Sequence, residues 1–372
     1  ILRALAYLPE DRFSSAEEMR ASIEACLTTR RVGTHLMTGS LDASLTGSSG
    51  DGQPRLRWKF TAEDEIRSTP LLHNDLLFIG AYDENLYALD PPTGTLRWKF
   101  ATEGGICSTP AAAGDIIVFG SEDTNIYALD VARHEVRWLF QTKGRIRSSA
   151  HLTEEACYIG SDDGHLYSID LQTGRENWRY RTWKPLRSTP VYHDQMVYVG
   201  SEDNAVYGVE ATSGVMKWKY QTLREITSSP VVSDKCVFIG SMDGNLYCFD
   251  AELGWQIWKF KTGHYILGSP RVQHGLVYVG SADQAIYAVD VKSGKLAWKF
   301  QAGGQISSTP ALHGDLLFFT CIDQNLYCLN ARTGKLSWRF RSDGMIPGSP
   351  VVNERTVYFG ATDGALYAVS ID

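Results

Sequence analysis

The chain has 372 residues, 43% of them hydrophobic, and its 36 basic and 43 acidic side chains give a net charge of −7. This length predicts two or three domains, although an all-β ring can be longer as a single domain. The acidic balance argues against a broad nucleic-acid surface, which needs clustered Lys and Arg. No run of about 18 apolar residues occurs, so the sequence predicts no membrane-spanning helix.

Residues 1–27 predict a short helical segment. A leucine-rich stretch ends at Pro9, and Ser14 to Glu18 provide overlapping capping boxes before apolar residues at helical spacing. The segment 4–18, which contains the sequence Pro-Glu-Asp-Arg-Phe, resembles the end of the kinase domain in bacterial eukaryotic-like serine/threonine protein kinases. That resemblance implies that residues 1–27 are the C-terminal remnant of such a domain, in which Arg12 pairs with an upstream glutamate. A generic helical hairpin is the alternative.

The chain is not expected to be an enzyme by itself. The Gly-rich loop, the catalytic-loop Asp and the Asp-Phe-Gly element that phosphoryl transfer requires are absent from the sequence. ATP and Mg²⁺ are therefore expected only in a kinase domain outside this chain, which would be a partner in cis.

Residues 28–54 predict a flexible linker. Twelve of the 22 residues from 33 to 54 are Gly, Ser or Thr, a composition typical of flexible chains. Because the sequence predicts no membrane span here, a cytoplasmic kinase would imply that the following domain is cytoplasmic too. The seven Cys form neither a C-x-x-C motif nor an adjacent pair, which fits reduced thiols.

Residues 55–372 contain a repeat with a step of 40 residues. Trp recurs at this step as Trp58, Trp98, Trp138, Trp178, Trp218, Trp258, Trp298 and Trp338. Asp recurs with it as Asp83, Asp123, Asp163, Asp203, Asp243, Asp283, Asp323 and Asp363. Each unit has four short β-rich runs, A to D, which in the first unit lie near 66–72, 76–81, 86–90 and 95–100. Four antiparallel strands in about 40 residues are the signature of a propeller blade.

The order of the runs predicts how the ring closes. The first D run, 56–60, precedes any A–B–C set, whereas the last set, 346–369, has no D run after it. We therefore expect an all-β, eight-bladed propeller of four-stranded antiparallel blades, closed by an N-terminal velcro strand that leaves no open sheet edge.

The repeat also carries a family resemblance. The segment Ala88 to Trp98 resembles the tryptophan-docking motif of PQQ-type repeats, in which Ala, Gly and Trp lock neighbouring blades. Other copies depart from this motif: His134 replaces the Gly, and the Ala is replaced by Ser168, Gly208, Cys248 and Cys328. The resemblance covers residues 58–372 and implies the fold. It does not define the function, because similar repeats occur in quinoprotein dehydrogenases, outer-membrane assembly lipoproteins and kinase sensor domains.

Signatures of catalysis or metal binding are absent from the sequence. It has no P-loop, H-E-x-x-H, G-x-S-x-G or EF-hand motif. The blades are minimal and lack the vicinal Cys pair of the quinone dehydrogenases, so PQQ is not expected as a cofactor. One Asp per blade around a wide ring cannot converge on one metal ion. We expect each Asp to bind backbone N–H groups of its own B–C turn, and the Trp series to serve blade packing.

A binding site is expected where the repeat breaks its own pattern. The D–A and B–C loops should share one face, and there the residue after the recurrent Ile or Leu of strand A is Arg67, Cys107, Arg147 and Arg187 in blades 1 to 4. In blades 5 to 8 the same position holds Thr227, Leu267, Ser307 and Pro347. The loops of this face add Trp183 and Tyr265. Arg67, Arg147, Arg187, Trp183 and Tyr265 are therefore our candidate residues for an anionic or amphiphilic ligand or a protein partner. The alternative is that the arginines pair with nearby acids as solvated ion pairs of little energetic value.

Three functions are compatible with the sequence. The first is a non-catalytic sensory or interaction propeller of a bacterial serine/threonine kinase, which binds a ligand or protein to regulate or target the kinase. The second is a scaffold propeller resembling outer-membrane protein assembly lipoproteins. The third, disfavoured by the minimal blades, is a PQQ-dependent dehydrogenase.

Overall fold

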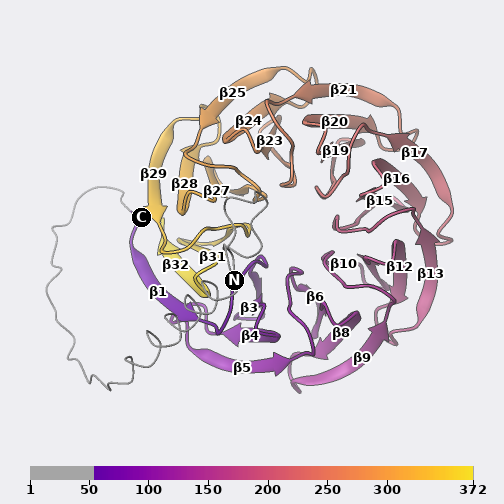
Figure 1. Ribbon diagram of the computed structural model, residues 1–372, viewed down its shortest axis with the longest axis vertical. Coiled ribbons are helices and arrows are strands. Elements are labelled where there is room, and N and C mark those ends of the chain that lie inside the picture. The colour runs from indigo at the N-terminus through magenta and orange to yellow at the C-terminus, as the bar shows by residue number, and fades with distance from the viewer. Residues whose placement is uncertain (1–53, 372) are drawn as a thin grey trace, which may run out of the picture. The chain divides into compact units, whose positions relative to one another are not determined.

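A computed structural model of the chain describes residues 54–371. The predicted helical segment 1–27 and nearly all of the linker 28–54 lie outside the described residues. The described part contains 32 strands and no helix, and the strands form eight four-stranded sheets arranged as blades around a ring (Figure 1). All paired strands run antiparallel, as in β3 and β4. The predicted eight-bladed all-β propeller is confirmed.

The strands are numbered along the chain, and blade 1 begins at β2. Blades 1 to 4 contain β2 (Leu71–His73), β3 (Leu76–Gly80), β4 (Asn85–Leu89), β5 (Leu96–Ala101); β6 (Ala111–Ala113), β7 (Ile116–Gly120), β8 (Asn125–Asp130), β9 (Glu135–Gln141); β10 (His151–Leu152), β11 (Ala156–Gly160), β12 (His165–Asp170), β13 (Glu176–Arg181); β14 (Val191–His193), β15 (Met196–Ser201), β16 (Ala205–Glu210) and β17 (Met216–Gln221).

Blades 5 to 8 contain β18 (Val231–Ser233), β19 (Cys236–Gly240), β20 (Asn245–Asp250), β21 (Gln256–Lys261); β22 (Arg271–Gln273), β23 (Leu276–Gly280), β24 (Ala285–Asp290), β25 (Leu296–Gln301); β26 (Ala311–His313), β27 (Leu316–Thr320), β28 (Asn325–Asn330), β29 (Leu336–Arg341); β30 (Val351–Asn353), β31 (Thr356–Gly360), β32 (Ala365–Ser370) and β1 (Leu56–Thr61).

Blade 8 is built from both ends of the described chain. Its strand order is β1-β32-β31-β30, so β1 occupies the outer position that a D strand fills in every other blade. Trp58 lies opposite Ala368, and Phe60 lies opposite Leu366. Figure 1 shows indigo β1 beside yellow β32. The predicted velcro closure is confirmed.

The innermost strand of each blade is shorter than the sequence predicts. In blade 1 we expected strand A from residue 66 to 72, but β2 begins only at Leu71. Pro70 has no N–H and cannot donate a ladder hydrogen bond, which fits a strand that begins only after it. The preceding residues bind elsewhere: the Ile66 N–H donates to the Ala361 carbonyl of blade 8 at 3.2 Å, and the Ser68 hydroxyl donates to the Gly80 carbonyl at 2.8 Å.

On the outer side of the ring, neighbouring blades are joined by a hydrogen bond from the recurrent Trp of one blade to the backbone of the next. The Trp58 indole in blade 8 donates its Nε1–H to the Pro91 carbonyl in blade 1 at 2.9 Å. Gly94, at φ +70°, lies so close to this indole that a Cβ there would be 2.5 Å from it. Equivalent indole bonds are formed by Trp138, Trp178, Trp218, Trp258 and Trp298. At the joint between blades 1 and 2, His134 replaces the Gly, and the Trp98 Nε1–H is buried without a hydrogen-bond partner among the described residues.

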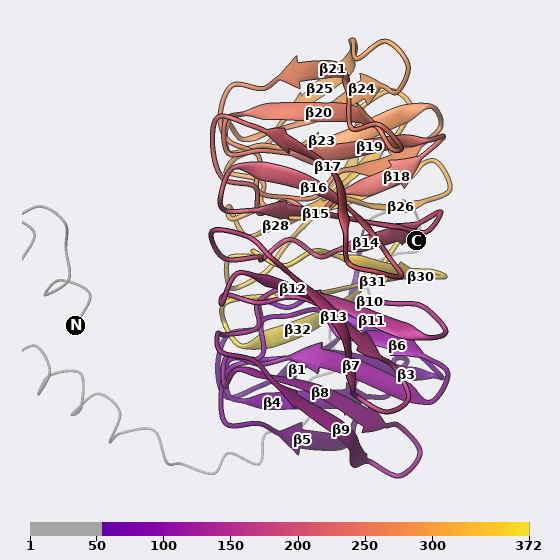
Figure 2. The ribbon, with the colours of Figure 1, turned by 90° about the vertical axis from the view of Figure 1, so that its right-hand side faces the viewer.

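The loops gather on two opposite faces, which Figure 2 shows edge-on. The strands cross from one face to the other, so the D–A and B–C loops lie together. The bond from the Tyr82 N–H in a B–C loop to the Glu65 carbonyl in a D–A loop, 3.0 Å long, joins the two loop series. This D–A/B–C face is the one that the sequence predicts to carry the site.

Candidate functional site

The recurrent Asp fixes the loops of this face. In blade 1 the Asp83 carboxylate accepts the Asn85 N–H of its own turn at 3.1 Å. Its other oxygen accepts the Tyr87 hydroxyl at 2.6 Å and the Glu63 N–H of the D–A loop at 2.9 Å. The bond to the D–A loop recurs at Asp123, Asp163, Asp203, Asp243, Asp283 and Asp323. Seven of the eight Asp residues therefore tie the loop that enters a blade to the turn of that blade, and in blade 8 the loop N–H of Asp343 donates to the Tyr367 hydroxyl instead.

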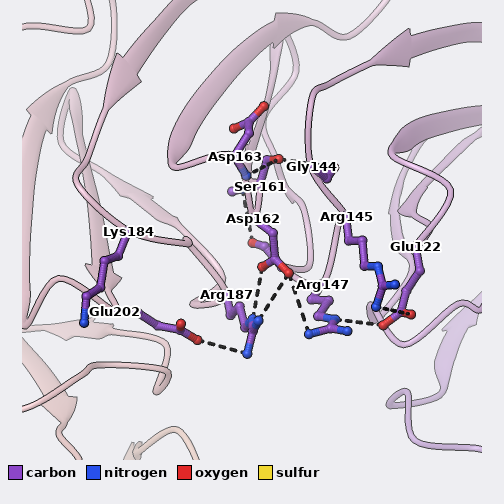
Figure 3. A network of polar contacts seen from close by, with 12 residues as sticks. Glu122, Gly144, Arg145, Arg147, Ser161, Asp162, Asp163, Lys184, Arg187 and Glu202 are labelled. Carbon is purple, nitrogen blue, oxygen red and sulfur yellow. Dashed lines mark hydrogen bonds and ion pairs between the residues drawn. The ribbon is translucent and has the colours of Figure 1, made fainter.

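Arg147 and Arg187 are joined in one chain of ion pairs (Figure 3). Arg187 contacts Asp162 of the preceding blade through Nε at 3.0 Å and Nη2 at 3.2 Å, and contacts Glu202 of its own blade at 3.1 Å. Arg147 binds Glu122 at 2.7 Å and approaches Asp162 at 3.6 Å. We call this chain, with Arg145 at 3.5 Å from Glu122, the arginine belt. It links blades 2, 3 and 4.

The electrostatics of the belt show a network that is neutralised internally. The hydrogen bond to Asp162 raises the pKa of the Arg187 guanidinium. Burial raises the pKa of Glu202, Asp162 adds to this rise, and Arg187 opposes it. The side chains of Arg147 and Arg187 are 27% and 36% exposed, so water only partly reaches them. The belt can hold three blades in register, and ligand binding by its arginines stays a prediction.

Arg67 lies apart from the belt. It pairs with Glu65 of its own loop at 2.6 Å, and its guanidinium lies over the Tyr82 ring at 5.3 Å. Burial raises the pKa of Tyr82 to about 12 and that of the Cys107 thiol to about 11, so both groups are neutral at pH 7. The structure therefore does not bring the three candidate arginines together as one cationic cluster.

Trp183 and Tyr265 belong to a different part of the same face. The Trp183 side chain is 83% exposed, and Leu223, at the equivalent position in the next blade, is 81% exposed. Tyr265 is half-buried, donates to Gln305 at 3.3 Å, and lines a cleft of about 330 Å³ with Leu223 and Met242. The cations around these apolar groups are Lys184, Arg224 and Lys261. We call these seven residues the blade 4–6 patch.

Leu223, Met242 and Arg224 were not among the residues predicted from the sequence, although the repeat contains a signal for Leu223. The position of Trp183 in the other described blades holds Glu63, Glu103, Lys143, Leu223, Gly263, Gly303 and Asp343. Only two neighbouring blades place a large apolar residue there. Comparing this series, as was done for the arginines, would have found Leu223.

Within residues 54–371, no group of three or more His, Cys, Asp or Glu side chains is placed to hold a metal ion. Over the same residues, no helix has the length and apolar character needed to cross a bilayer.

Eight minimal blades, a docking tryptophan on each outer strand and a velcro closure define a PQQ-type repeat propeller. A family model described as outer membrane protein assembly factor BamB matches residues 49–153, 143–228, 222–308 and 297–372. These matches cover most of the chain, and the chain belongs to this family. A comparison with curated proteins finds no match.

Several solved structures share the fold. BamB from Moraxella catarrhalis superposes with a TM-score of 0.74 at 18% identity, covering 85% of this chain and 99% of that one. The computationally designed Ika8 protein gives 0.76 at 15% identity, covering 83% and 97%. A europium-containing methanol dehydrogenase gives 0.72 at 14% identity, covering 85% and 93%. At these identities the likeness concerns the fold alone.

Proposed function

We propose that this chain is a non-catalytic interaction propeller that binds a protein partner through the blade 4–6 patch. The observation that carries the proposal is the pair Trp183 and Leu223, which extend from adjacent loops with more than 80% of each side chain exposed. Trp is among the residues most enriched at the central contacts of protein interfaces, and an exposed Leu on the next loop extends the apolar surface. Single exposed apolar residues are common on protein surfaces and need no explanation, but two large ones on adjacent loops do.

The charges around the patch favour an acidic partner. Lys184 is 3.7 Å from Glu225, but the side chain of Arg224 forms no ion pair with any residue in the described range. Lys261 binds the backbone carbonyl of Asp243 and no carboxylate within that range. Arg224 and Lys261 line the cleft beside Leu223, so an apolar segment with an acidic residue next to it would complement this part of the patch.

We further propose that the propeller serves a bacterial serine/threonine kinase, either sensing a signal or recruiting substrates. This part rests on the resemblance of residues 4–18 to the end of such kinase domains, and those residues lie outside the described range. The kinase domain in cis and the cytoplasmic location belong to the same proposal.

A second candidate is a scaffold that assembles other proteins. It is supported by membership of the family described as outer membrane protein assembly factor BamB. Both candidates use the propeller to bind proteins, and they differ in what the partner is. Nothing in the geometry of the described residues favours the third candidate, a quinone-dependent dehydrogenase.

The test is cross-linking of the full-length protein in its host cell, followed by mass spectrometry. Replacing Trp183 and Leu223 by Ala should remove the specific partner. The matched control replaces Trp255 and Leu253, which are 70% and 50% exposed in a C–D turn on the opposite face. Equal loss in both variants, or in neither, would contradict this placement. A captured kinase substrate favours the first candidate, and a captured outer-membrane assembly component favours the second.

A further inference from the structure

The inner strands surround a central channel whose wall is built from alternate residues. Along the first blade Ile66, Ser68 and Pro70 are buried, whereas Arg67, Thr69 and Leu71 remain accessible, and the pattern recurs around the ring. Alternate side chains of an extended chain point to opposite sides, so every second residue faces the channel. The channel encloses about 500 Å³ and is lined by residues from all eight blades.

One level of the wall consists entirely of hydroxyl side chains. We call it the hydroxyl ring, and its members are Thr69, Thr109, Ser149, Thr189, Ser229, Ser269, Thr309 and Ser349. The Thr109 N–H donates to the Ser149 hydroxyl at 2.8 Å, and four similar bonds lead to Ser229, Ser269, Thr309 and Ser349. In each bond the hydroxyl oxygen is the acceptor. Its proton is therefore left to donate, which gives the channel a ring of hydrogen-bond donors.

The next level, two residues further along each strand, is apolar except at two positions. It contains Leu71, Ala111, His151, Val191, Val231, Arg271, Ala311 and Val351, and we call it the inner ring. Five of them, Arg271 and His151 included, line the channel cavity. The two levels are about 7 Å apart along an extended strand, a distance that an arginine side chain can cover.

Arg271 has no partner in this wall. Its guanidinium forms no hydrogen bond or ion pair with any other described residue, in contrast to Arg147 and Arg187 at the channel mouth. No Asp or Glu lines the cavity. The side chain is open to water in the channel but surrounded by protein, and this desolvation lowers the pKa of Arg271. Desolvation also lowers the pKa of His151, so its imidazole is neutral at pH 7 and can still donate one hydrogen bond.

We propose that the central channel binds the phosphate group of a small molecule, with Arg271 as its charged anchor and the hydroxyl ring as further donors. The guanidinium fork matches two oxygens of an oxyanion, and the hydroxyls offer donors from several directions, which a tetrahedral phosphate can use more fully than a planar carboxylate. The apolar inner ring leaves room for the rest of the ligand. This site is separate from the blade 4–6 patch, so it does not rest on the proposed function.

The experiment titrates inorganic phosphate, and separately succinate, into the full-length protein at constant ionic strength and follows binding by calorimetry. Phosphate should bind saturably at one site. Arg271→Val should weaken this binding at least 10-fold. Val already occupies the equivalent position at 191, 231 and 351, so the repeat accommodates this substitution. Arg97→Ala removes the same charge from an exposed position on the outer strand of blade 1 and should leave phosphate binding unchanged.

Three results would overturn the proposal. The first is no saturable phosphate binding up to about 10 mM, a concentration that would nearly saturate a site with a Kd of about 1 mM. The second is equal phosphate affinity in the wild type and Arg271→Val. The third is succinate binding more tightly than phosphate, which would make the ligand class wrong. Circular dichroism of each variant establishes that it is folded.

Discussion

The glycine of the docking motif sets how closely two blades approach. At Gly254 the backbone has φ +71°, and a Cβ would lie 2.5 Å from the Trp218 ring of the preceding blade. Gly275 has nearly the same φ, +73°, but a Cβ there would meet nothing within 4 Å. The two glycines therefore share the backbone requirement and differ only in the packing requirement.

Replacing each glycine by Ala separates these two requirements. Gly275→Ala should lower the free energy of unfolding by about 1 kcal/mol, because an L-residue is strained at positive φ. Gly254→Ala should cost about 1–3 kcal/mol more, because the methyl group overpacks against the indole. Urea unfolding of both variants measures the difference. Equal losses would mean that the docking contact does not limit blade packing.

The turn Asp residues make stability depend on pH. Burial alone would raise the pKa of Asp243, but hydrogen bonds from the Tyr247 hydroxyl and from Asn245 more than offset it, and the pKa lies below its usual value. A carboxyl whose folded pKa is depressed stabilises the fold above its unfolded pKa of about 4, and this contribution is lost as the pH falls through the folded pKa. The pKa values of Asp163 and Asp323 are lowered as well.

We therefore expect the free energy of unfolding to decrease as the pH drops below about 4. Asp243→Asn should be less stable than the wild type at pH 7 but should lose less stability between pH 5 and pH 3. Urea unfolding at several pH values between 7 and 3 tests this. An unchanged pH profile in the variant would show that Asp243 does not contribute to the acid sensitivity.

At the scale of elements, the strand β1 completes the ring. It supplies the outer edge of blade 8 and the Trp58 indole that docks on blade 1. A chain of residues 62–372 would leave the β32 edge unpaired and open to other chains. Its melting temperature should fall by roughly 10 °C, given the lost Trp packing and pairing. A chain of residues 54–372, which keeps β1, is the control.

Thermal unfolding and size-exclusion chromatography of the two truncated chains measure this effect. We expect 54–372 to stay monomeric if the untruncated chain is monomeric, and 62–372 to associate. A stable 62–372 chain without association would show that three strands suffice for blade 8.

The blades were predictable from the sequence because the same pattern of turn residues and Trp recurs eight times. Turn residues and the Trp step define the outer strands to within one residue, as for β5. The inner strand was placed too early, because Ile66 and Ser68 alternate like strand residues but hydrogen-bond to a neighbouring blade and to the next strand. Alternation reports which side a residue faces, and it does not report whether the backbone pairs in a ladder.

The candidate site was less predictable for a physical reason. Series of equivalent positions show which residues face the mouth, but not how side chains of adjacent blades pair. Arg187 reaches back to Asp162 of the preceding blade, whereas Arg67 turns to Glu65 within its own loop. Two arginines at the same repeat position therefore have different surroundings, and only the pairing geometry separates them.

At the scale of the whole molecule, three parts bear on binding, and two of them lie on the D–A/B–C face. The arginine belt spans blades 2 to 4, the exposed apolar anchors lie on blades 4 and 5, and the channel opens between all eight blades. The charged groups of the belt pair with one another. By contrast, the side chains of Trp183 and Leu223 are exposed, and the Arg271 guanidinium has no partner among the described residues. We therefore assign a structural role to the belt and binding roles to the other two parts.

This division predicts how two arginines at equivalent positions respond to removal. Arg187→Ala leaves Asp162 and Glu202, both only about 15–18% exposed, without their main partner. It should lower the free energy of unfolding by about 1–3 kcal/mol, between the values for exposed and buried pairs. Arg67→Ala removes a half-exposed pair within one loop and should cost less than about 0.5 kcal/mol.

Urea unfolding measures the loss of stability in both variants. Adding 1 M NaCl should reduce the loss caused by Arg187→Ala only partly, because this ion pair is half-shielded from water. Equal costs for the two variants would mean that the belt does not hold the blades, and Arg147 and Arg187 would then return as candidates for ligand binding.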